Sequence, residues 1–553
     1  MNAILLATTI VVFVNGNIYT LDERRPRAQA IAVQDGKILD VGTDEQIRGL
    51  SRSAKVVDLR GRTVIPGLID AHGHLGGLGS LALGALDLRG TKSYDEVIAA
   101  VVERAKEKKK GEWIVGSGWD HESWPEKALP THARLSAAVP DHPVWISRVD
   151  GHAGLASLAA LQAAGLVDTP GSRRAAPEGG AILLDEKGQP TGVLVDRAMD
   201  LVERAIPGDA AGAPSLERIY LAAQQRCFEV GLTGVHDAGV SSAEIAALKG
   251  LAADGRLKLR VYAMVAADAE YVRKNAPIVG DRLTVRSVKL VADGAMGSRG
   301  AWLLAPYSDR PQDERGGPYV GLPILKRPEV EDFARLCLER GYQVATHAIG
   351  DRANREVLDA YEAAFAKSGK PAWKAAHEAR FRLEHAQRVD PADIPRLAEL
   401  SVIASMQPTH CTSDMRWLEK RLGPERLPGC YAWASMLRHH VGLALGSDFP
   451  VESPDPILGI YAACTRQDLA GEPEGGFMPG EKLTREEAVR GFTQGAAYAA
   501  FEEDRRGTIA LTRDADFVVL DRDILTSGRG ELLKARVVMT VVGGEVVFER
   551  KEK

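Results

Sequence analysis

Cysteine is scarce in this chain. Its 553 residues contain only five cysteines, and no two of them form a Cys-x-x-Cys pair. The odd number and the wide spacing argue against a disulfide framework, and the missing pairs argue against a structural zinc site. We therefore expect a protein of a reducing, cytoplasmic compartment. The five positions are Cys227, Cys337, Cys411, Cys430 and Cys464.

An excess of charge of one sign is also missing. The chain has 75 acidic and 70 basic residues and a formal net charge of -5, which leaves no electrostatic footprint for nucleic acid. The one conspicuous basic run, within residues 106–110, is interpreted as the solvated end of a helix. We expect a small-molecule substrate and no nucleic-acid partner, and we leave a homodimer open because barrel proteins can dimerise through their outer helices.

Long apolar runs are missing as well. No stretch approaches the ~18 uninterrupted apolar residues that a membrane span needs. The run over residues 3–14 is apolar, but no Lys or Arg precedes it and no clear small-residue cleavage site follows it. We therefore expect neither a signal peptide nor a membrane partner.

Both ends of the chain carry the pattern of antiparallel sheet. Short runs rich in Val and Ile are separated by turn dipeptides, such as Asn15-Gly16, Asp35-Gly36 and Gly543-Gly544. Since both ends are β and the middle alternates strand and helix, we predict that residues 1–65 and 500–553 join in one small β-sandwich.

The middle of the chain predicts a barrel. Short apolar runs that end in polar residues alternate with helical stretches, and eight such runs are the number of a (β/α)8, TIM-like barrel of the α/β class. We assign residues 66–75 and 216–499 to this barrel. The eight runs are 63–72, 231–237, 257–265, 285–293, 342–347, 381–386, 401–407 and 442–448.

The first gap between runs is too long for one helix and its loops. It contains strand-like runs of its own at 113–118 and 144–149, and it ends in the Pro/Gly/Ala-rich segment 206–214. We predict an inserted α/β subdomain over residues 76–215. An insertion after the first barrel strand lies over the face where barrels place their active sites, so it is a candidate lid or substrate wall.

The segment 66–74, PGLIDAHGH, carries the first candidate ligands. Residues i and i+2 of a strand point to the same side, so His72 and His74 can converge on one point inside the barrel. Two neutral imidazoles at this spacing make half of a tetrahedral metal site. The alternative is two ordinary polar histidines at a strand end.

Lys289 is the second candidate, because it lies in the middle of an otherwise apolar strand. Burying an ammonium group without a partner is costly. A neutral amine can instead take up carbon dioxide and become a carbamate, whose two oxygens can bridge two cations. The alternative is an ion pair with Asp293 on the same face.

Single polar residues end three later strands: His347, His385 and Asp448. Their meeting at one mouth of the barrel is what metal assembly requires, although Asp448 has the alternative role of a helix N-cap. His236 and Asp237 are assigned to the mouth or to support of the ligands.

Substrate contacts are assigned to Trp119, Asp120, His152 and Arg299, each of which also has a structural alternative. The remaining histidines considered, His410, His439 and His440, are taken as surface or loop residues.

Together these motifs resemble the YtcJ-like branch of the amidohydrolase superfamily, which includes N-substituted formamide deformylases. The resemblance spans nearly the whole chain and is specific for the branch, but it is a poor guide to the substrate. The segments that carry it are 66–74, 289–300 (KLVADGAMGSRG), 347–351 (HAIGD), 383–386 (LEHA) and 446–448 (GSD).

The resemblance implies a metal-dependent hydrolase acting on an amide-type carbon–nitrogen bond, with one or two divalent ions. Zinc is the expected metal, with iron, manganese or nickel as alternatives. Asp448 is the candidate proton carrier. Deamination, cleavage of an ester, carbamate or lactone, and a non-catalytic regulatory role remain open. The implied ligands are His72, His74 and Asp448 for the more buried ion, His347 and His385 for the second, and a carboxylated Lys289 between them.

Overall fold

A computed structural model describes residues 9–167, 175–207, 214–313 and 315–551. The apolar run 3–14 therefore begins outside the described residues, and most of the segment 206–214 also lies outside them. Within the described ranges, no helix is long and apolar enough to cross a membrane.

Eight parallel strands form the central sheet, and their spatial order follows the chain from β8 to β21. Each strand overlaps one of the eight apolar runs, so the predicted TIM-like barrel is confirmed, although the first half of the run 63–72 forms a separate strand, Thr63–Pro66, in another sheet. The strands are β8 (Leu68–Gly73), β15 (Leu232–Val240), β16 (Arg260–Ala266), β17 (Leu283–Val291), β18 (Gln343–Ala348), β19 (Arg382–His385), β20 (Ile403–Met406) and β21 (Leu443–Leu445).

Backbone hydrogen bonds beyond β21 join the last strand to the first. The Asp448 amide donates to the His72 carbonyl at 2.7 Å, and the His74 amide donates to the Phe449 carbonyl at 2.8 Å. The carboxyl ends of β8 and β21 therefore meet, although they lie almost 400 residues apart in the sequence.

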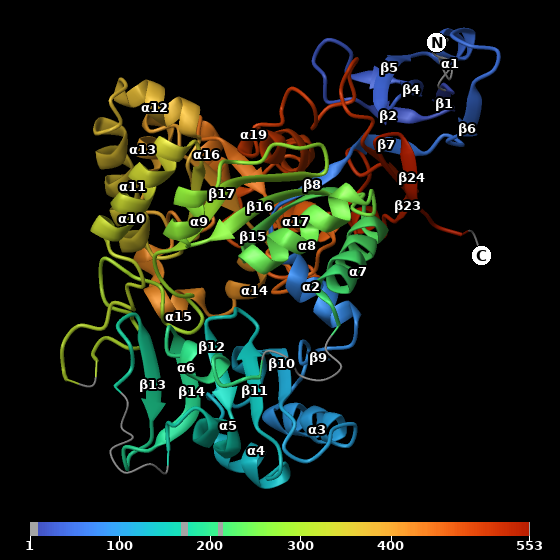
Figure 1. Cartoon of the computed structure of the whole chain (residues 1–553). Coiled ribbons are helices and arrows are strands. Elements are labelled where there is room, and N and C mark those ends of the chain that lie inside the picture. The colour runs from blue at the N-terminus through green and yellow to red at the C-terminus, as the bar shows by residue number, and fades with distance from the viewer. Residues whose placement is uncertain (1–8, 168–174, 208–213, 314, 552–553) are drawn as a thin grey trace.

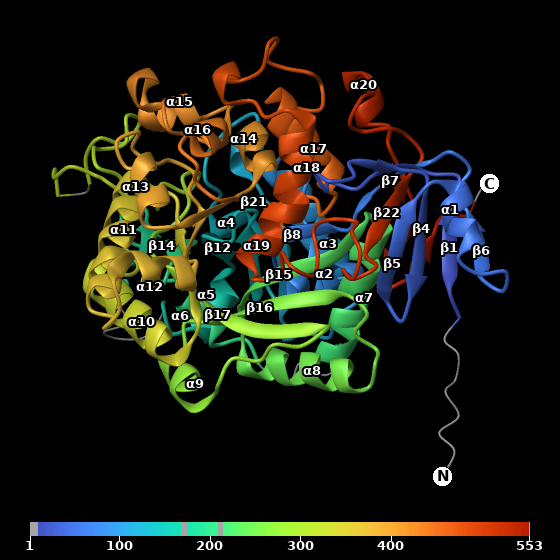
Figure 2. The ribbon, with the colours of Figure 1, turned by 90° about the horizontal axis from the view of Figure 1, so that it is seen from above.

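Helices cover the outside of the barrel, as Figures 1 and 2 show. Their ends follow ordinary capping rules; for example, Ser241 and Glu244 form a capping box at the start of α8. The helices are α2 (Leu75–Ala82), α7 (Leu216–Glu229), α8 (Ser242–Ala253), α9 (Ala269–Lys274), α10 (Arg327–Arg340), α11 (Asp351–Ala366), α12 (Ala372–Ala379), α13 (Ile394–Glu399), α14 (Pro408–Asp414), α15 (Leu418–Leu422), α16 (Trp433–Arg438), α17 (Pro456–Thr465), α18 (Arg485–Arg490) and α19 (Ala496–Ala499).

The two chain ends form the predicted β-sandwich. Strand β22 from the C-terminal segment pairs with β7 from the N-terminal segment, and residues of both segments, such as Phe13 and Phe517, share one core. One sheet has the order β5-β4-β1-β6 and the other β24-β23-β22-β7-β2-β3. Their bounds are β1 (Val11–Val14), β2 (Asn17–Tyr19), β3 (Arg27–Ala28), β4 (Ala30–Gln34), β5 (Lys37–Gly42), β6 (Lys55–Asp58), β7 (Thr63–Pro66), β22 (Phe517–Leu520), β23 (Val537–Val542) and β24 (Glu545–Glu549), with α1 (Asp44–Gly49) and α20 (Arg529–Leu532) beside them.

The insertion after the first barrel strand is an α/β unit, as predicted. Its mixed sheet has the order β13-β14-β12-β11-β10-β9, and in Figure 1 it lies on a different side of the barrel from the sandwich. The runs 113–118 and 144–149 correspond to two of its strands. The elements are β9 (Leu86–Asp87), β10 (Ile114–Trp119), β11 (Val144–Arg148), β12 (Ala153–Ala156), β13 (Gly180–Leu184), β14 (Pro190–Asp196), α3 (Tyr94–Ala105), α4 (His132–Ala138), α5 (Leu158–Ala163) and α6 (Asp200–Glu203).

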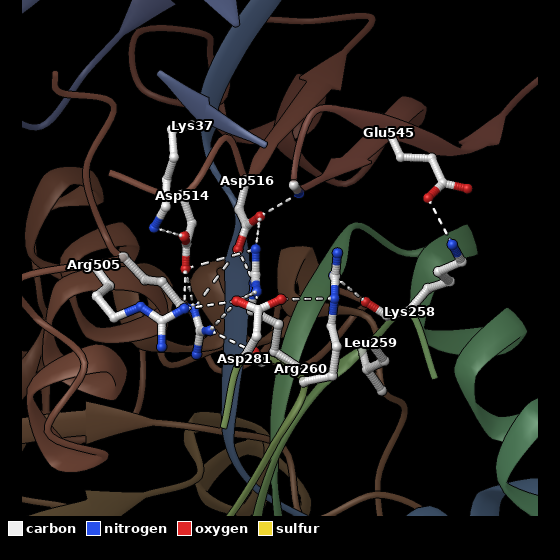
Figure 3. A network of polar contacts seen from close by, with 12 residues as sticks. Lys37, Lys258, Leu259, Arg260, Asp281, Arg505, Asp514, Asp516 and Glu545 are labelled. Carbon is white, nitrogen blue, oxygen red and sulfur yellow. Dashed lines mark hydrogen bonds and ion pairs between the residues drawn. The ribbon is translucent and has the colours of Figure 1, made fainter. Parts of the chain in front are cut away.

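A cluster of ion pairs joins the sandwich to the barrel (Figure 3). Arg260 at the start of β16 makes a two-pronged contact with Asp516, at 2.5 and 2.8 Å, and Arg506 contacts Asp514 at 3.0 Å. The side chains of these four residues are at most 5% exposed. Burial alone would raise the pKa of Asp514, but the charge of Arg260, the hydrogen bond from Lys37 and the charge of Arg506 lower it to about 2.

This cluster should make the protein sensitive to acid in a defined pH range. A carboxyl group whose folded-state pKa is depressed from 3.8 to about 2 contributes stability that is complete above about pH 4 and is lost as the pH falls through about 2. One pKa unit corresponds to about 1.4 kcal/mol, so we expect Asp514→Asn to cost about 2 kcal/mol at pH 6.

Urea unfolding of the wild type and of Asp514→Asn, at pH values from 6 to 2.5, measures how much the Asp514 charge contributes to stability. The difference between wild type and Asp514→Asn should shrink as the pH falls. A difference that stays constant over the whole range would show that the charge of Asp514 does not stabilise the fold.

Candidate metal centre

His72 near the end of β8 and His74 just after it lie beside the aspartate that follows β21. His74 Nε2 is 3.0 Å and His72 Nε2 is 3.7 Å from Asp448 Oδ1. The left-handed backbone of Asp448, with φ of +62°, is uncommon for a residue other than glycine and occurs often at functional sites. The first and last strands of the barrel therefore bring their candidate ligands together.

His347 and His385 complete this cluster. The ring centroid of His385 lies 4.8 Å from that of His72 and 4.5 Å from that of His347. One potential ligand atom from each of His72, His385 and Asp448 lies within 4.8 Å of the others. Five of the six predicted ligands thus share one site.

The hydrogen bonds of the histidines fit metal binding. His72 Nδ1 lies 2.5 Å from Glu384 Oε2, His74 Nδ1 lies 2.9 Å from the Ala238 carbonyl, and His385 Nδ1 lies 2.8 Å from Gln407 Oε1. When Nδ1 donates to such an acceptor, Nε2 keeps a lone pair for a metal.

The buried His347 Nε2 has no hydrogen-bond partner among the described residues, and the buried Asp448 Oδ1 faces only imidazole nitrogens, those of His74 at 3.0 Å and His72 at 3.7 Å. Buried polar atoms are costly unless something binds them. Burial also lowers the pKa values of His72, His347 and His385 well below their ordinary value, which keeps these rings in the neutral form that binds metal. The residues present therefore fit a divalent cation.

Lys289 is the sixth predicted ligand, and it is buried in the same cavity. Its Nζ lies 3.0 Å from His72 Nε2, and burial lowers the pKa of the amine. The alternative ion pair with Asp293 does not form between these two described residues. The Asp293 carboxylate instead accepts hydrogen bonds from the amides of Trp302, Ile349 and Gly350, at 2.8 to 2.9 Å.

Asp70 and Asp237 also hold the mouth of the barrel together through backbone groups. Asp70 accepts hydrogen bonds from the amide and hydroxyl of Ser447 and from the amide of His72, so it ties β8 to the segment after β21. Asp237 accepts from the Leu75 amide at 2.9 Å, which agrees with a supporting role. Burial raises the pKa of each of these carboxyl groups to about 7.

The cluster lies in a cavity of about 1,480 Å³ whose walls come from both the barrel and the insert. Asp120 and His152, two of the residues assigned to substrate contact, line this cavity. Asp120 also contacts Arg148 at 2.8 Å, and His152 Nδ1 lies 2.7 Å from Asp196 Oδ1.

Two predicted substrate contacts are not brought to the cavity. Trp119 is fully buried in the core of the insert, where its Nε1 donates to the Ile146 carbonyl at 2.9 Å. Arg299 pairs with Asp309 at 2.9 Å and is not among the residues that line the cavity. Both side chains therefore take the structural alternative, although Arg299 pairs with a different acid from the one expected.

The prediction that His410 is a surface or loop residue is wrong. His410 lies on α14, its side chain is 13% exposed, and its Nε2 is 3.7 Å from Asp448 Oδ2. His410 lies four residues beyond β20 and outside the predicted run 401–407, so the search for single residues at the ends of the runs did not include it. His439 and His440 are exposed, as expected.

Sequence reasoning also missed the buried charges beneath the cluster. Glu384, which holds His72, pairs with Arg382 at 2.6 Å, and both side chains are completely buried. Arg382 also contacts His236 at 2.9 Å, so His236 lies in the supporting layer and not in the cavity mouth. The sequence did contain a signal for this layer, because two charged residues, Arg382 and Glu384, lie within one short apolar strand.

The protein is a parallel eight-stranded barrel. Histidines and a carboxylate gather at the carboxyl ends of its strands, and they are suited to bind a divalent cation. The chain belongs to the Amidohydrolase family, whose model matches residues 55–548. This membership supports a hydrolase that uses a divalent metal.

Relatives of known sequence and structure agree with this membership. The chain is 33% identical to a putative amidohydrolase, YtcJ, of Bacillus subtilis, over 97% of this chain and 98% of the relative. It is 29% identical to an N-substituted formamide deformylase of Arthrobacter pascens, over 98% of each chain. An uncharacterized metal-dependent hydrolase from Pyrococcus horikoshii has a similar structure, with a TM-score of 0.74 and 27% identity over 94% of this chain and 99% of the other.

Proposed function

We propose that this protein hydrolyses an amide-type carbon–nitrogen bond in a small molecule, such as an N-acyl or N-formyl amine. The observation that carries the proposal is the set of ligand atoms from His72, His385 and Asp448, all within 4.8 Å of one another in a cavity large enough for a small substrate. The similarity to a deformylase of N-substituted formamides favours the amide class.

The proposed centre holds two divalent ions, with zinc as the first candidate. His72, His74 and Asp448 would hold one ion, His347 and His385 the other, and Lys289 as a carbamate would join them. When bound, such ions ionise water near neutral pH and polarise the substrate carbonyl.

Asp448 would move the proton in this reaction. Its Oδ2 faces His410 Nε2 across 3.7 Å, while its Oδ1 faces the histidines of β8. Burial raises the pKa of Asp448, but the contact with His74 and the facing imidazoles of His72 and His410 lower it below its ordinary value. The ionised carboxylate can take a proton from water and deliver it to the leaving nitrogen. The insert, which supplies Asp120 and His152, would form the substrate wall above it.

A metal-dependence experiment tests this function. The protein is stripped with a chelator, dialysed, and reloaded with zinc, manganese, iron or nickel, and the release of amine is followed on a panel of N-formyl and N-acyl amines. We expect activity to disappear on stripping and to return on reloading. Metal analysis alongside distinguishes one bound ion from two.

The same panel includes matched esters, lactones, carbamates and amidines. Faster cleavage of those compounds than of every amide would replace the amide proposal with an ester-type hydrolase or a deaminase. Tight metal binding without turnover of any compound would favour a non-catalytic role.

A further inference from the structure

The insert carries a histidine and an aspartate side by side at the edge of the metal cavity. His152 lies just before β12, and Asp196 ends β14; these strands pair antiparallel, with Ala153 opposite Val195. His152 Nδ1 lies 2.7 Å from Asp196 Oδ1, and the Asp196 amide donates to the His152 carbonyl at 3.0 Å. The two residues are therefore held together by side-chain and backbone contacts.

Asp196 is locked against the barrel. Its side chain is completely buried, and it packs against two glycines in the loop after β17. A Cβ atom at Gly294 or Gly300 would lie only 2.4 or 2.6 Å from Asp196 Oδ2. Because these two residues have no Cβ atom, the Asp196 carboxylate can pack against the barrel. This contact fixes the position of His152 relative to the metal centre.

His152 faces the substrate space beside a candidate ligand. Its side chain is 19% exposed and lines the cavity, and its ring centroid lies 4.9 Å from that of His347. No described residue forms a hydrogen bond with its Nε2. Burial lowers the pKa of His152, but the hydrogen bond to Asp196 and the charges of Asp196 and Asp150 raise it above its ordinary value. A divalent cation held by the neighbouring His347 would disfavour a second positive charge on the ring. With its one proton on Nδ1 and shared with Asp196, the imidazole would then keep Nε2 as a hydrogen-bond acceptor.

We propose that His152 Nε2 accepts a hydrogen bond from the N–H group of the scissile amide, and that Asp196 is the positioning residue that aims it. This rests on the proposed amide hydrolysis and narrows its substrate class to amides that keep an N–H group. A site built around such an acceptor disfavours N,N-disubstituted amides, because they leave the buried acceptor unpaired.

Paired substrates test this proposal. The secondary amide that wild-type enzyme cleaves fastest is compared with its N-methyl analogue, which differs only in the lost N–H group and the added methyl group. We expect His152→Ala to lower kcat/KM for the secondary amide about tenfold to a hundredfold, and to change kcat/KM for the N-methyl amide by less than about threefold. Comparing the same two compounds across variants cancels their intrinsic difference in reactivity.

Variants of the partner test the positioning role. Asp196→Asn keeps an acceptor oxygen for Nδ1, so it should retain more of the preference for the secondary amide than Asp196→Ala does. Bound metal, measured for every variant, should equal that of wild type. If Asp196→Ala unfolds, His152→Ala alone still decides the proposal.

The failures are distinguishable. If wild type cleaves neither amide, the proposed function fails, and the inference fails with it. If wild type cleaves the amides but His152→Ala lowers both rates equally, only the inference fails. Loss of bound metal in His152→Ala would make His152 a ligand and would also overturn it.

Discussion

Asp448→Asn should lower kcat/KM for an amide substrate about a thousandfold while the protein stays folded. The amide side chain has nearly the same shape as the carboxylate, but it cannot take a proton from water and return it to the leaving nitrogen, and general acid–base catalysis of this kind contributes about 10²- to 10⁴-fold. The Asp448 carboxylate lies 3.0 to 3.7 Å from nitrogens of three histidines, at the centre of the candidate metal site.

Steady-state kinetics with metal analysis measures this effect. Asp455→Asn is a matched control, because Asp455 caps α17 seven residues later and asparagine is an equally good N-cap. We expect the control to keep nearly full activity. If Asp448→Asn keeps its metal and loses less than about tenfold in kcat/KM, another group moves the proton.

Arg382→Met should cost about 3 to 5 kcal/mol of stability, the largest effect expected of any single substitution outside the candidate ligands. Arg382 and Glu384 are both completely buried, with 2.6 Å between Arg382 Nε and Glu384 Oε1. The guanidinium also donates to the Ala71 carbonyl at 2.7 Å and to the Ser405 hydroxyl at 2.9 Å. Removing one partner of a buried pair leaves the other charge uncompensated.

Urea unfolding at neutral pH measures this cost. Arg327→Met serves as the control, because Arg327 pairs with Asp359 at 3.2 Å but is 45% exposed, and exposed pairs contribute about 1 kcal/mol or less. The double variant Arg382→Met with Glu384→Met should recover part of the loss, since it removes the stranded carboxylate as well. A loss below about 1 kcal/mol in Arg382→Met would contradict the argument.

The barrel could be predicted from local patterns. A strand that is buried on both faces is an apolar run, and a polar residue that ends such a run lies at the carboxyl end of the barrel. This reasoning located all eight strands and the candidate ligands at their ends, from His72 to Asp448. The turn dipeptides likewise predicted the sandwich, because their backbone requirements are local.

Contacts between segments far apart in the sequence could not be predicted in this way. Nothing local says that His410 on α14 approaches Asp448, or that Glu384 on β19 reaches His72. The Nδ1 partners of the histidines depend on which strands become neighbours and how far each side chain reaches.

The sequence by itself therefore determined the order of the strands, the kinds of ligand at their ends and the presence of an insertion, because these follow from periodicity and residue chemistry. The tertiary structure alone decided which ring nitrogen of a candidate histidine is free to bind metal, and which carboxylates instead accept hydrogen bonds from the backbone. It also decided which residues of the insert face the cavity. The physical reason is that burial and hydrogen bonding at the mouth of the barrel arise only when residues hundreds of positions apart are packed together.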